Sequence, residues 1–394
     1  MQQKWDIFCK IVDNYGDIGV CWRLARQLND EHYLQIRLWV DDFSVAKKII
    51  QDLNLAKSSQ ICNGVTIIKW DKNADFECAA TVVIETFSCG LPPAYLAAMA
   101  SEKSKWINLE YLSAEAWVDD FHAQSSPQSS INTKTSLTRH FYFPGFTTKT
   151  GGLIRESQIT SQLPNSLNPC QPAGEGVRAH SRGAIYSDSD TAPLSNITPA
   201  SWRDSLINGQ DSFTNPTLKI SLFCYPNAPI NHLFDALQAN NHAVLVYVPQ
   251  SSILPNIATF FGKKSITIGD IFTKNSLTVA ILPFLNQANY DELLSDCDLN
   301  FVRGEDSWIR AIWAGKPFIW QPYFQDENTH ITKLNAFINL FYANYEHRQV
   351  VCEAHRVWVA GQGSQDECKA MMLNYSTQLD ALKTYTLMQA IQLS

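Results

Sequence analysis

The chain has 394 residues, which is too long for one ordinary hydrophobic core, so two domains are expected. Hydrophobic residues make up 45% and charged residues 18% of the chain, which excludes a globally disordered protein. The formal net charge of −7 argues against a nucleic-acid partner, because a general nucleic-acid binder needs a surface rich in Lys and Arg.

The sequence predicts a reduced, cytoplasmic, soluble protein with no membrane partner. Its first residues lack the long apolar region of a signal peptide, and no apolar run approaches the length of about 20 residues needed to cross a bilayer. The 10 cysteines are scattered without any C-x-x-C spacing, and several lie inside apolar runs. That pattern is typical of buried thiols rather than of a disulfide framework.

Residues 1–156 alternate apolar, β-rich runs with helical patterns. The expected strands are residues 5–12, 34–40, 65–70, 80–86 and 105–109, and the expected helices are residues 20–28, 43–53 and 92–100. Strands that alternate with helices predict βαβ units and a parallel sheet covered on both faces.

Residues 157–216 have a different character, because Ser, Asn, Pro, Gly and Gln dominate and the periodicity disappears. Such a segment cannot bury enough apolar surface to offset the entropy lost on ordering it. We therefore expect an inter-domain linker that is enlarged by a mobile surface insertion.

The alternation restarts in residues 217–365, which predict a second domain. The expected strands are residues 218–224, 243–248, 277–284, 299–302 and 317–320, and the expected helices are residues 231–238, 290–295, 307–314 and 329–343. Residues 366–394 are expected to be helical and to pack back on the first domain. The predicted fold class is α/β, with two Rossmann-like domains facing a central cleft that binds a ligand beyond the carboxyl ends of the strands.

A first motif with chemical potential lies between the first strand and the first helix, in a turn that opens into the cleft. Its two glycines allow the backbone to turn tightly and approach a ligand, and its two carboxylates can both face that ligand. A helix cap is the alternative interpretation of Asp17, since a carboxylate near a helix start satisfies free N–H groups. The residues assigned to the site are Asp13, Asn14, Tyr15, Gly16, Asp17 and Gly19.

A second motif, Asn300 to Trp308, runs from a strand into a helix. The N–H groups of a helix start, together with the Ser307 hydroxyl, form an anion site, and Arg303 can add a charge-assisted bond to a phosphate. Glu305 and Asp306 would repel a diphosphate, so they are expected to bind sugar hydroxyls or backbone donors. The alternative is an ordinary capped helix.

Aromatic and amide side chains near strand ends predict a site for a pyrimidine base. Tyr225 and Phe284 end two strands, and Tyr323 and Gln325 follow another. For each aromatic ring alone, core packing is the alternative explanation. The histidines show no metal-ligand spacing, so no metal site is expected.

At these residues the sequence resembles the EarP family, the protein-arginine rhamnosyltransferases of bacterial elongation factor P. The resemblance rests on segments in both predicted domains: DNYGDIGVCWRLARQL, INLEYLSAEAWV, FYFPGFTTKTGGLIRE, SLFCYPN and LNFVRGEDSWIRAIWAGKPFIWQ. The chain differs from the family in the length of its insertion at 157–215 and in the surroundings of Tyr323 and Gln325.

The resemblance implies a GT-B fold and an inverting transfer of rhamnose from dTDP-β-L-rhamnose to an arginine side chain of elongation factor P, without a metal or other cofactor. It implies that the first domain binds the acceptor and the second the nucleotide sugar. Asp17 would be the catalytic base, supported by Asp13 and Glu305. The implied donor ligands are Arg303, Asp306, Ser307, Tyr225, Phe284, Gln287, Tyr323 and Gln325.

Three other functions remain open from the residues alone. One is a GT-B enzyme with another nucleotide sugar or acceptor, because its phosphate site would look the same. Another is a non-catalytic sugar-nucleotide-binding protein. An NAD-dependent oxidoreductase is disfavoured, because the G-x-G-x-x-G fingerprint follows none of the predicted strands.

Overall fold

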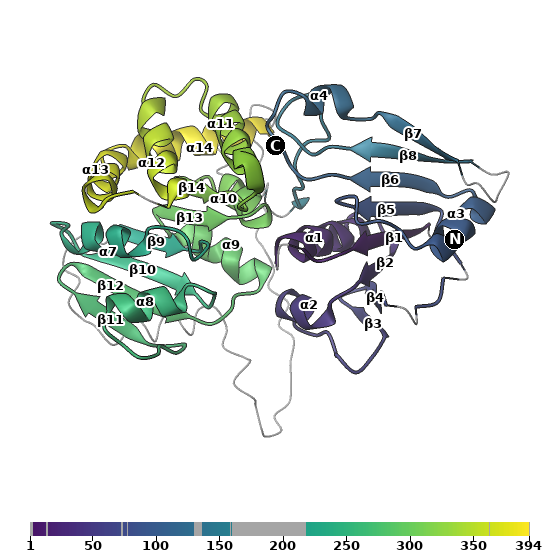
Figure 1. Cartoon of the computed structure of the whole chain (residues 1–394), viewed down its shortest axis with the longest axis horizontal. Coiled ribbons are helices and arrows are strands. Elements are labelled where there is room, and N and C mark those ends of the chain that lie inside the picture. The colour runs from purple at the N-terminus through teal and green to yellow at the C-terminus, as the bar shows by residue number, and fades with distance from the viewer. Residues whose placement is uncertain are drawn as a thin grey trace, which may run out of the picture. The chain divides into compact units, whose positions relative to one another are not determined.

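A computed structural model describes residues 3–12, 15–71, 74–76, 78–129, 136–157, 159, 218–361 and 363–393 (Figure 1). The described residues up to 156 and from 218 onward form one compact unit that holds two β-sheets. The linker predicted for residues 157–216 lies outside the described residues, apart from residues 157 and 159. The predicted domain boundaries therefore remain predictions.

The first sheet has eight strands in the order β3-β4-β2-β1-β5-β6-β8-β7. Its strands are parallel except at the two edges, where β3 pairs antiparallel with β4 and β7 with β8. The central strand β1 continues to β2 on one side and is flanked by β5 on the other. The strands are β1 (Lys4–Cys9), β2 (Gln35–Val40), β3 (Ser59–Cys62), β4 (Val65–Lys69), β5 (Val82–Thr86), β6 (Lys105–Leu109), β7 (Ser125–Ser129) and β8 (Ser136–Tyr142).

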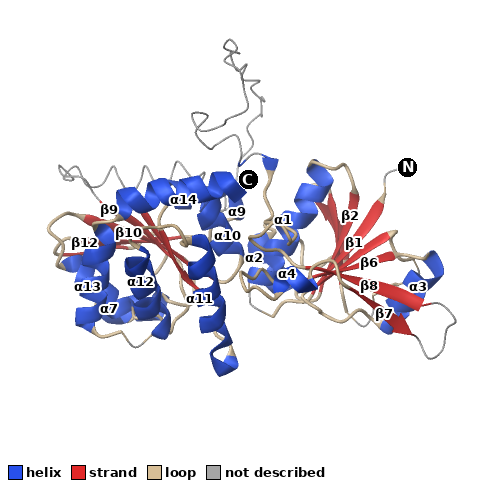
Figure 2. Cartoon of the chain, turned by 90° about the horizontal axis from the view of Figure 1, so that it is seen from above, coloured by secondary structure: helices blue, strands red, loops and turns tan. Residues whose placement is uncertain are grey.

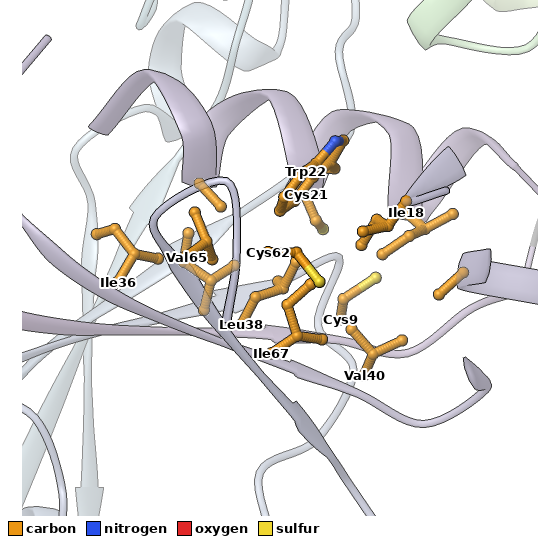
Figure 3. Packing of buried hydrophobic residues seen from close by; sticks show 14 of the residues in the cluster. Cys9, Ile18, Cys21, Trp22, Ile36, Leu38, Val40, Cys62, Val65 and Ile67 are labelled. Carbon is orange, nitrogen blue, oxygen red and sulfur yellow. The ribbon is translucent and has the colours of Figure 1, made fainter. Parts of the chain in front are cut away.

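Both faces of this sheet are covered, as its apolar strands require. Successive side chains of β1 point to opposite faces, so Ile7 packs under the first helices while Phe8 packs beside Tyr95 on the other face. Figure 3 shows the first of these cores, in which Cys9 and Cys21 act as small apolar side chains. The helices are α1 (Gly16–Asp30), α2 (Phe43–Ile49), α3 (Pro93–Glu102) and α4 (Val118–Phe121).

The second sheet has six strands in the order β11-β12-β10-β9-β13-β14, and only its edge strand β11 is antiparallel. Strand β9 lies between β10 and β13, so the direction of the chain connections reverses at β9, as it does at β1 in the first sheet. Ligands of such doubly wound sheets bind at the carboxyl ends of the strands at that reversal. The strands are β9 (Leu218–Leu222), β10 (Val244–Pro249), β11 (Ile271–Lys274), β12 (Leu277–Leu282), β13 (Leu299–Arg303) and β14 (Phe318–Gln321).

Helices cover the second sheet on two sides: in Figure 2, α9 and α14 lie on one side of its strands and α7, α12 and α13 on the other. None of the helices in the described ranges has the length and apolar character needed to cross a bilayer. The helices are α7 (Ile230–Gln238), α8 (Leu254–Phe260), α9 (Gln287–Asp296), α10 (Asp306–Ala314), α11 (Thr329–Phe341), α12 (Arg348–Ala360), α13 (Gln365–Ser376) and α14 (Leu379–Leu393), with a short 3-10 turn, η2 (Asp326–Asn328).

The last two helices correct one expectation. We expected residues 366–394 to pack back on the first domain, but α13 packs on α7 and α12, and α14 packs on α10. The buried Tyr375 hydroxyl donates to the Phe318 carbonyl at 2.9 Å, and the Tyr385 ring stacks on Tyr342 at 5.8 Å. These helices bury their apolar side chains against helices of the second sheet, which belong to the same half of the chain.

Candidate active site

Asp17 lies in the first turn of α1 and is 1% exposed. One of its carboxylate oxygens accepts a hydrogen bond from the Val12 N–H at 2.7 Å, and the other accepts one from the Tyr111 hydroxyl at 3.1 Å. These bonds hold the carboxylate between the loop that precedes α1 and the loop that follows β6. The other two polar residues of the motif, Asp13 and Asn14, lie outside the described residues.

Gly19, in the next turn of α1, lies against the beginning of α10. A Cβ atom at Gly19 would lie 3.2 Å from the Asp306 Cγ, which is a tight contact, so the missing side chain gives Asp306 room at this helix contact. The Gln287 amide donates to the Gly19 carbonyl at 2.9 Å. The glycine predicted to approach a ligand thus makes room for the side chain of Asp306.

The second motif forms a tight turn between β13 and α10. Gly304 has a φ of +60°, and α10 begins two residues later at Asp306. The Ser307 hydroxyl accepts a hydrogen bond from the Arg303 N–H at 3.0 Å and donates to the Arg303 carbonyl. The hydroxyl that we assigned to an anion site therefore also closes this turn.

Arg303 is held at the end of β13 by aromatic rings. Its guanidinium carbon lies 4.3 Å from the centre of the Phe223 ring and 4.7 Å from that of Tyr225. One guanidinium nitrogen donates to the Cys224 carbonyl at 3.3 Å. The positive charge is thus fixed near the N-terminus of α10, where two sources of positive potential add.

The two acidic residues of the motif bind donors from the first half of the chain. Glu305 accepts a hydrogen bond from the Leu112 N–H at 2.7 Å. Asp306 accepts a hydrogen bond from the Arg23 Nε at 2.7 Å. The charge of Asp306 is thus compensated by Arg23, while Glu305 is bound by a backbone donor.

Arg23 is the centre of a buried ion network that joins α1, α9 and α10. It also contacts Asp291 and Glu156, each at 3.2 Å. Arg310 binds the same two carboxylates at 2.7 and 2.6 Å. Burial lowers the pKa of Arg23, but the three neighbouring carboxylates outweigh that effect and raise it above the ordinary range. Burial raises the pKa of Glu156, and the two guanidinium groups outweigh it and lower the pKa.

A first pocket lies in front of α10 and encloses an empty volume of about 650 Å³, including the part open to solvent. It brings together residues of both motifs and two of the residues predicted to bind the base, Tyr225 and Phe284. The Tyr15 and Phe284 rings meet edge to face at 5.0 Å on its wall. The predicted site residues that line it are Tyr15, Gly16, Tyr225, Phe284, Gln287, Arg303, Glu305, Asp306 and Ser307.

A second pocket, of about 750 Å³, contains Asp17. Its predicted members are Gly16, Asp17, Glu305, Tyr323 and Gln325. The buried Oε1 atom of Gln325 meets no hydrogen-bond partner among the described residues, so this side chain has an acceptor left for a ligand. Gly16, Gly304 and Glu305 line both pockets, so the two pockets adjoin at these residues.

Sequence reasoning missed several residues of the second pocket. Phe87, Tyr111 and Lys333 line it, and the first two follow the carboxyl ends of β5 and β6. An aromatic residue directly after a strand of the same parallel sheet was the available signal. The motif INLEYLSAEAWV was used for the resemblance, yet it carried no assigned site residue.

The arrangement combines the groups needed to transfer a phosphate-linked group. Arg303 and the α10 N-terminus can bind an anion, while the buried carboxylate of Asp17 can hold a cation or receive a proton. Within the described ranges, no three His, Cys, Asp or Glu side chains are grouped so as to hold a metal ion. The absence of a metal from the reaction remains a prediction.

Comparisons with known proteins agree on one family. A family model described as elongation factor P (EF-P) rhamnosyltransferase EarP matches residues 5–393. A protein-arginine rhamnosyltransferase of Pseudomonas putida is 40% identical over 340 residues, which cover 86% of this chain and 81% of that protein. A protein-arginine rhamnosyltransferase of Neisseria meningitidis is 33% identical over 361 residues, covering 89% and 81%.

A solved structure supports the same assignment. It is described as the structural basis for EarP-mediated arginine glycosylation of translation elongation factor EF-P. The two chains superpose with a TM-score of 0.61 at 26% identity, over 100% of this chain and 94% of that one. The similarity thus extends over both sheets.

Proposed function

The chain belongs to the EarP family of protein-arginine rhamnosyltransferases and has their GT-B fold, and on that premise we propose its donor, acceptor and mechanism. The donor is dTDP-β-L-rhamnose and the acceptor is one arginine side chain of EF-P. Transfer inverts the anomeric carbon and uses no metal. Because EF-P is a translation factor, we place the reaction in the cytoplasm.

The observation that carries the proposal is the junction of the two pockets at Gly16, Gly304 and Glu305. Arg303 lies on one side of that junction and Asp17 on the other. A nucleotide sugar whose diphosphate lies near Arg303 would direct its sugar toward the second pocket. The reacting carbon would then face the group proposed as the base.

The first pocket supplies the donor chemistry. The N–H groups at the beginning of α10 and the guanidinium of Arg303 stabilise the negative charge that develops on the departing dTDP. Tyr15, Tyr225 and Phe284 offer aromatic faces for the pyrimidine base. Fixed protein dipoles and one arginine perform the charge stabilisation that a metal ion supplies in other transferases.

The acceptor sets the role of Asp17. A guanidinium has a pKa above about 12, so a carboxylate cannot remove its proton before the reaction. Asp17 instead holds the guanidinium by charge-assisted hydrogen bonds and directs one nitrogen at the anomeric carbon. As the C–N bond forms, the C–O bond to the phosphate breaks, dTDP leaves with the electron pair, and the proton of the nitrogen passes to Asp17.

The donor half of the proposal is tested by calorimetry and by the stereochemistry of the product. We expect dTDP-β-L-rhamnose to bind in the presence of EDTA and to bind more tightly than UDP-glucose. We also expect NMR of the modified acceptor to show an α-linked rhamnose. Binding that requires a divalent cation, or a β-linked product, would contradict the mechanism.

A further inference from the structure

We propose that Tyr111 is a positioning residue for the transfer, which acts by fixing the orientation of the Asp17 carboxylate through its phenolic hydroxyl. The inference rests on the proposed role of Asp17 as the base. It assigns a function to a side chain that follows β6, in the loop that faces the beginning of α1.

Tyr111 is one of the hydrogen-bond donors to the Asp17 carboxylate. Two donors bind two different oxygens of its carboxylate: the Val12 N–H at 2.7 Å and the Tyr111 hydroxyl at 3.1 Å. Each donor restricts the rotation of the carboxylate about its bond to Cβ. Two donors on opposite oxygens fix its plane and thereby the direction in which its remaining lone pairs point.

The Tyr111 ring is itself held in place. It stacks on the Phe87 ring with centroids 4.1 Å apart and planes 8° from parallel. Phe87 and the residue after it, Ser88, both adopt left-handed backbone conformations, with φ of 56° and 51°. Such conformations cost about 1–3 kcal/mol each and persist only where the surrounding structure enforces them.

The enforcing contacts join the loops that follow β5 and β6. The Phe87 N–H donates to the Leu109 carbonyl at 2.6 Å, and the Ser88 hydroxyl donates to Glu110 at 2.8 Å. The first bond extends the pairing of β5 and β6, in which Thr86 lies beside Leu109, so Phe87 and Tyr111 both lie in the loops just beyond the paired strand ends. The strained turn after β5 therefore has a local consequence, which is to place an aromatic surface under Tyr111.

A positive charge lies near the Tyr111 ring. The Lys333 ammonium, from α11, lies 5.6 Å from the centre of the Tyr111 ring. A cation near the ring is attracted by its π-electrons and increases the tendency of the phenol to donate its proton in a hydrogen bond. Tyr111 thus lies among an aromatic ring, a cation and a carboxylate, and all three also line the second pocket.

Loss of the Tyr111 hydroxyl should therefore slow turnover without weakening donor binding. Tyr111 does not line the first pocket, so its hydroxyl is not expected to affect donor binding. Its loss removes one of the hydrogen bonds that hold the Asp17 carboxylate on the line between the acceptor nitrogen and the sugar. A displacement of about 1 Å in such a group can reduce the rate by about 100-fold.

The test is the variant Tyr111→Phe, which removes one oxygen atom and keeps the stacked ring. We expect kcat for transfer to EF-P to fall by about 10–100-fold, with the donor KM and the calorimetric donor Kd changed less than about twofold. Phe87→Leu keeps the hydroxyl but removes the stacking surface, and it should lower kcat by a smaller factor with the same unchanged donor KM.

Tyr95→Phe is the matched control. The Tyr95 hydroxyl also donates to a buried carboxylate, that of Asp6, but it lies in the core beside β1 and lines neither pocket. Tyr95→Phe should lower the melting temperature and leave kcat unchanged. If Tyr111→Phe changes only the melting temperature, as Tyr95→Phe does, or raises the donor KM in proportion to any loss, Tyr111 is not a positioning residue. Failure of the wild-type protein to modify EF-P would instead overturn the proposed function itself.

Discussion

Replacing Asp17 by Asn is expected to reduce single-turnover transfer by about 100- to 10,000-fold while the donor still binds. Asparagine has nearly the same shape and keeps an oxygen that can accept the Val12 N–H. It has no negative charge to hold the guanidinium, and it cannot take the proton that is released when the C–N bond forms. The measurement is rapid-quench transfer at saturating donor, together with calorimetry of the donor alone.

Asp41→Asn is the control for that substitution. Asp41 also accepts a backbone N–H from the segment after β1, that of Ile11 at 2.9 Å, but it lines neither pocket. It should lose little activity. A large loss of donor affinity in Asp17→Asn, with normal single-turnover chemistry once the donor is bound, would contradict the role of Asp17 as the base.

The second large effect is expected on stability. Arg23→Met should lower the free energy of unfolding by about 3–5 kcal/mol, because it removes one partner of a buried ion network and leaves carboxylates without compensation. The side chain of Arg23 is 6% exposed and contacts three carboxylates, from Glu156, Asp291 and Asp306. Arg310 contacts only two of these three, so Asp306 would keep no arginine partner among the described residues. Urea unfolding at neutral pH measures the effect.

Arg26→Met is the comparison on the same helix. Arg26 pairs with Asp30 at 3.6 Å, and both side chains are about half exposed, so the substitution should cost less than about 1 kcal/mol. Equal effects of the two substitutions would show that the network contributes no more than a surface pair does.

The network also predicts a pH dependence. Because the pKa of Glu156 is lowered in the folded state, its contribution is fully present above the ordinary pKa of Glu, about 4.3, and is lost as the pH falls through the folded value. The wild-type protein should therefore lose stability on acidification, and Arg23→Met should lose less, since one of the two guanidinium groups that lower this pKa is gone.

The parallel strands of both sheets, apart from β8, were predictable because each is an apolar run between polar turns. Strand 105–109 was predicted with the bounds that the structure gives to β6, and residues 277–284 contain β12. The antiparallel edge strands were missed, because a strand such as β7, with the sequence SSPQS, has no apolar face to detect. Helix α1 begins four residues before the predicted start at residue 20, since its first turn contains Asp17 and two glycines, which do not form a helical apolar pattern.

The site was predictable only in part, and the reason is distance along the chain. Asp17 and Arg303 stand at strand and helix ends, where a local pattern indicates a ligand. The residues that bind these motifs lie far away along the chain, so no local pattern indicates the contacts. Arg23 and Asp306 are 283 residues apart, and Tyr111 and Asp17 are 94 residues apart. The tail of the chain shows the same limit, because its apolar pattern indicated helices but not the surface on which they pack.

The most direct test of the proposed function is intact-mass spectrometry of EF-P after incubation with this protein and dTDP-β-L-rhamnose in EDTA, followed by peptide mapping. We expect the mass of one added deoxyhexose, located on a single arginine, and a far smaller modified fraction with Asp17→Asn at the same incubation time. An unchanged EF-P mass, under conditions in which calorimetry shows the donor to be bound, would contradict the proposed acceptor.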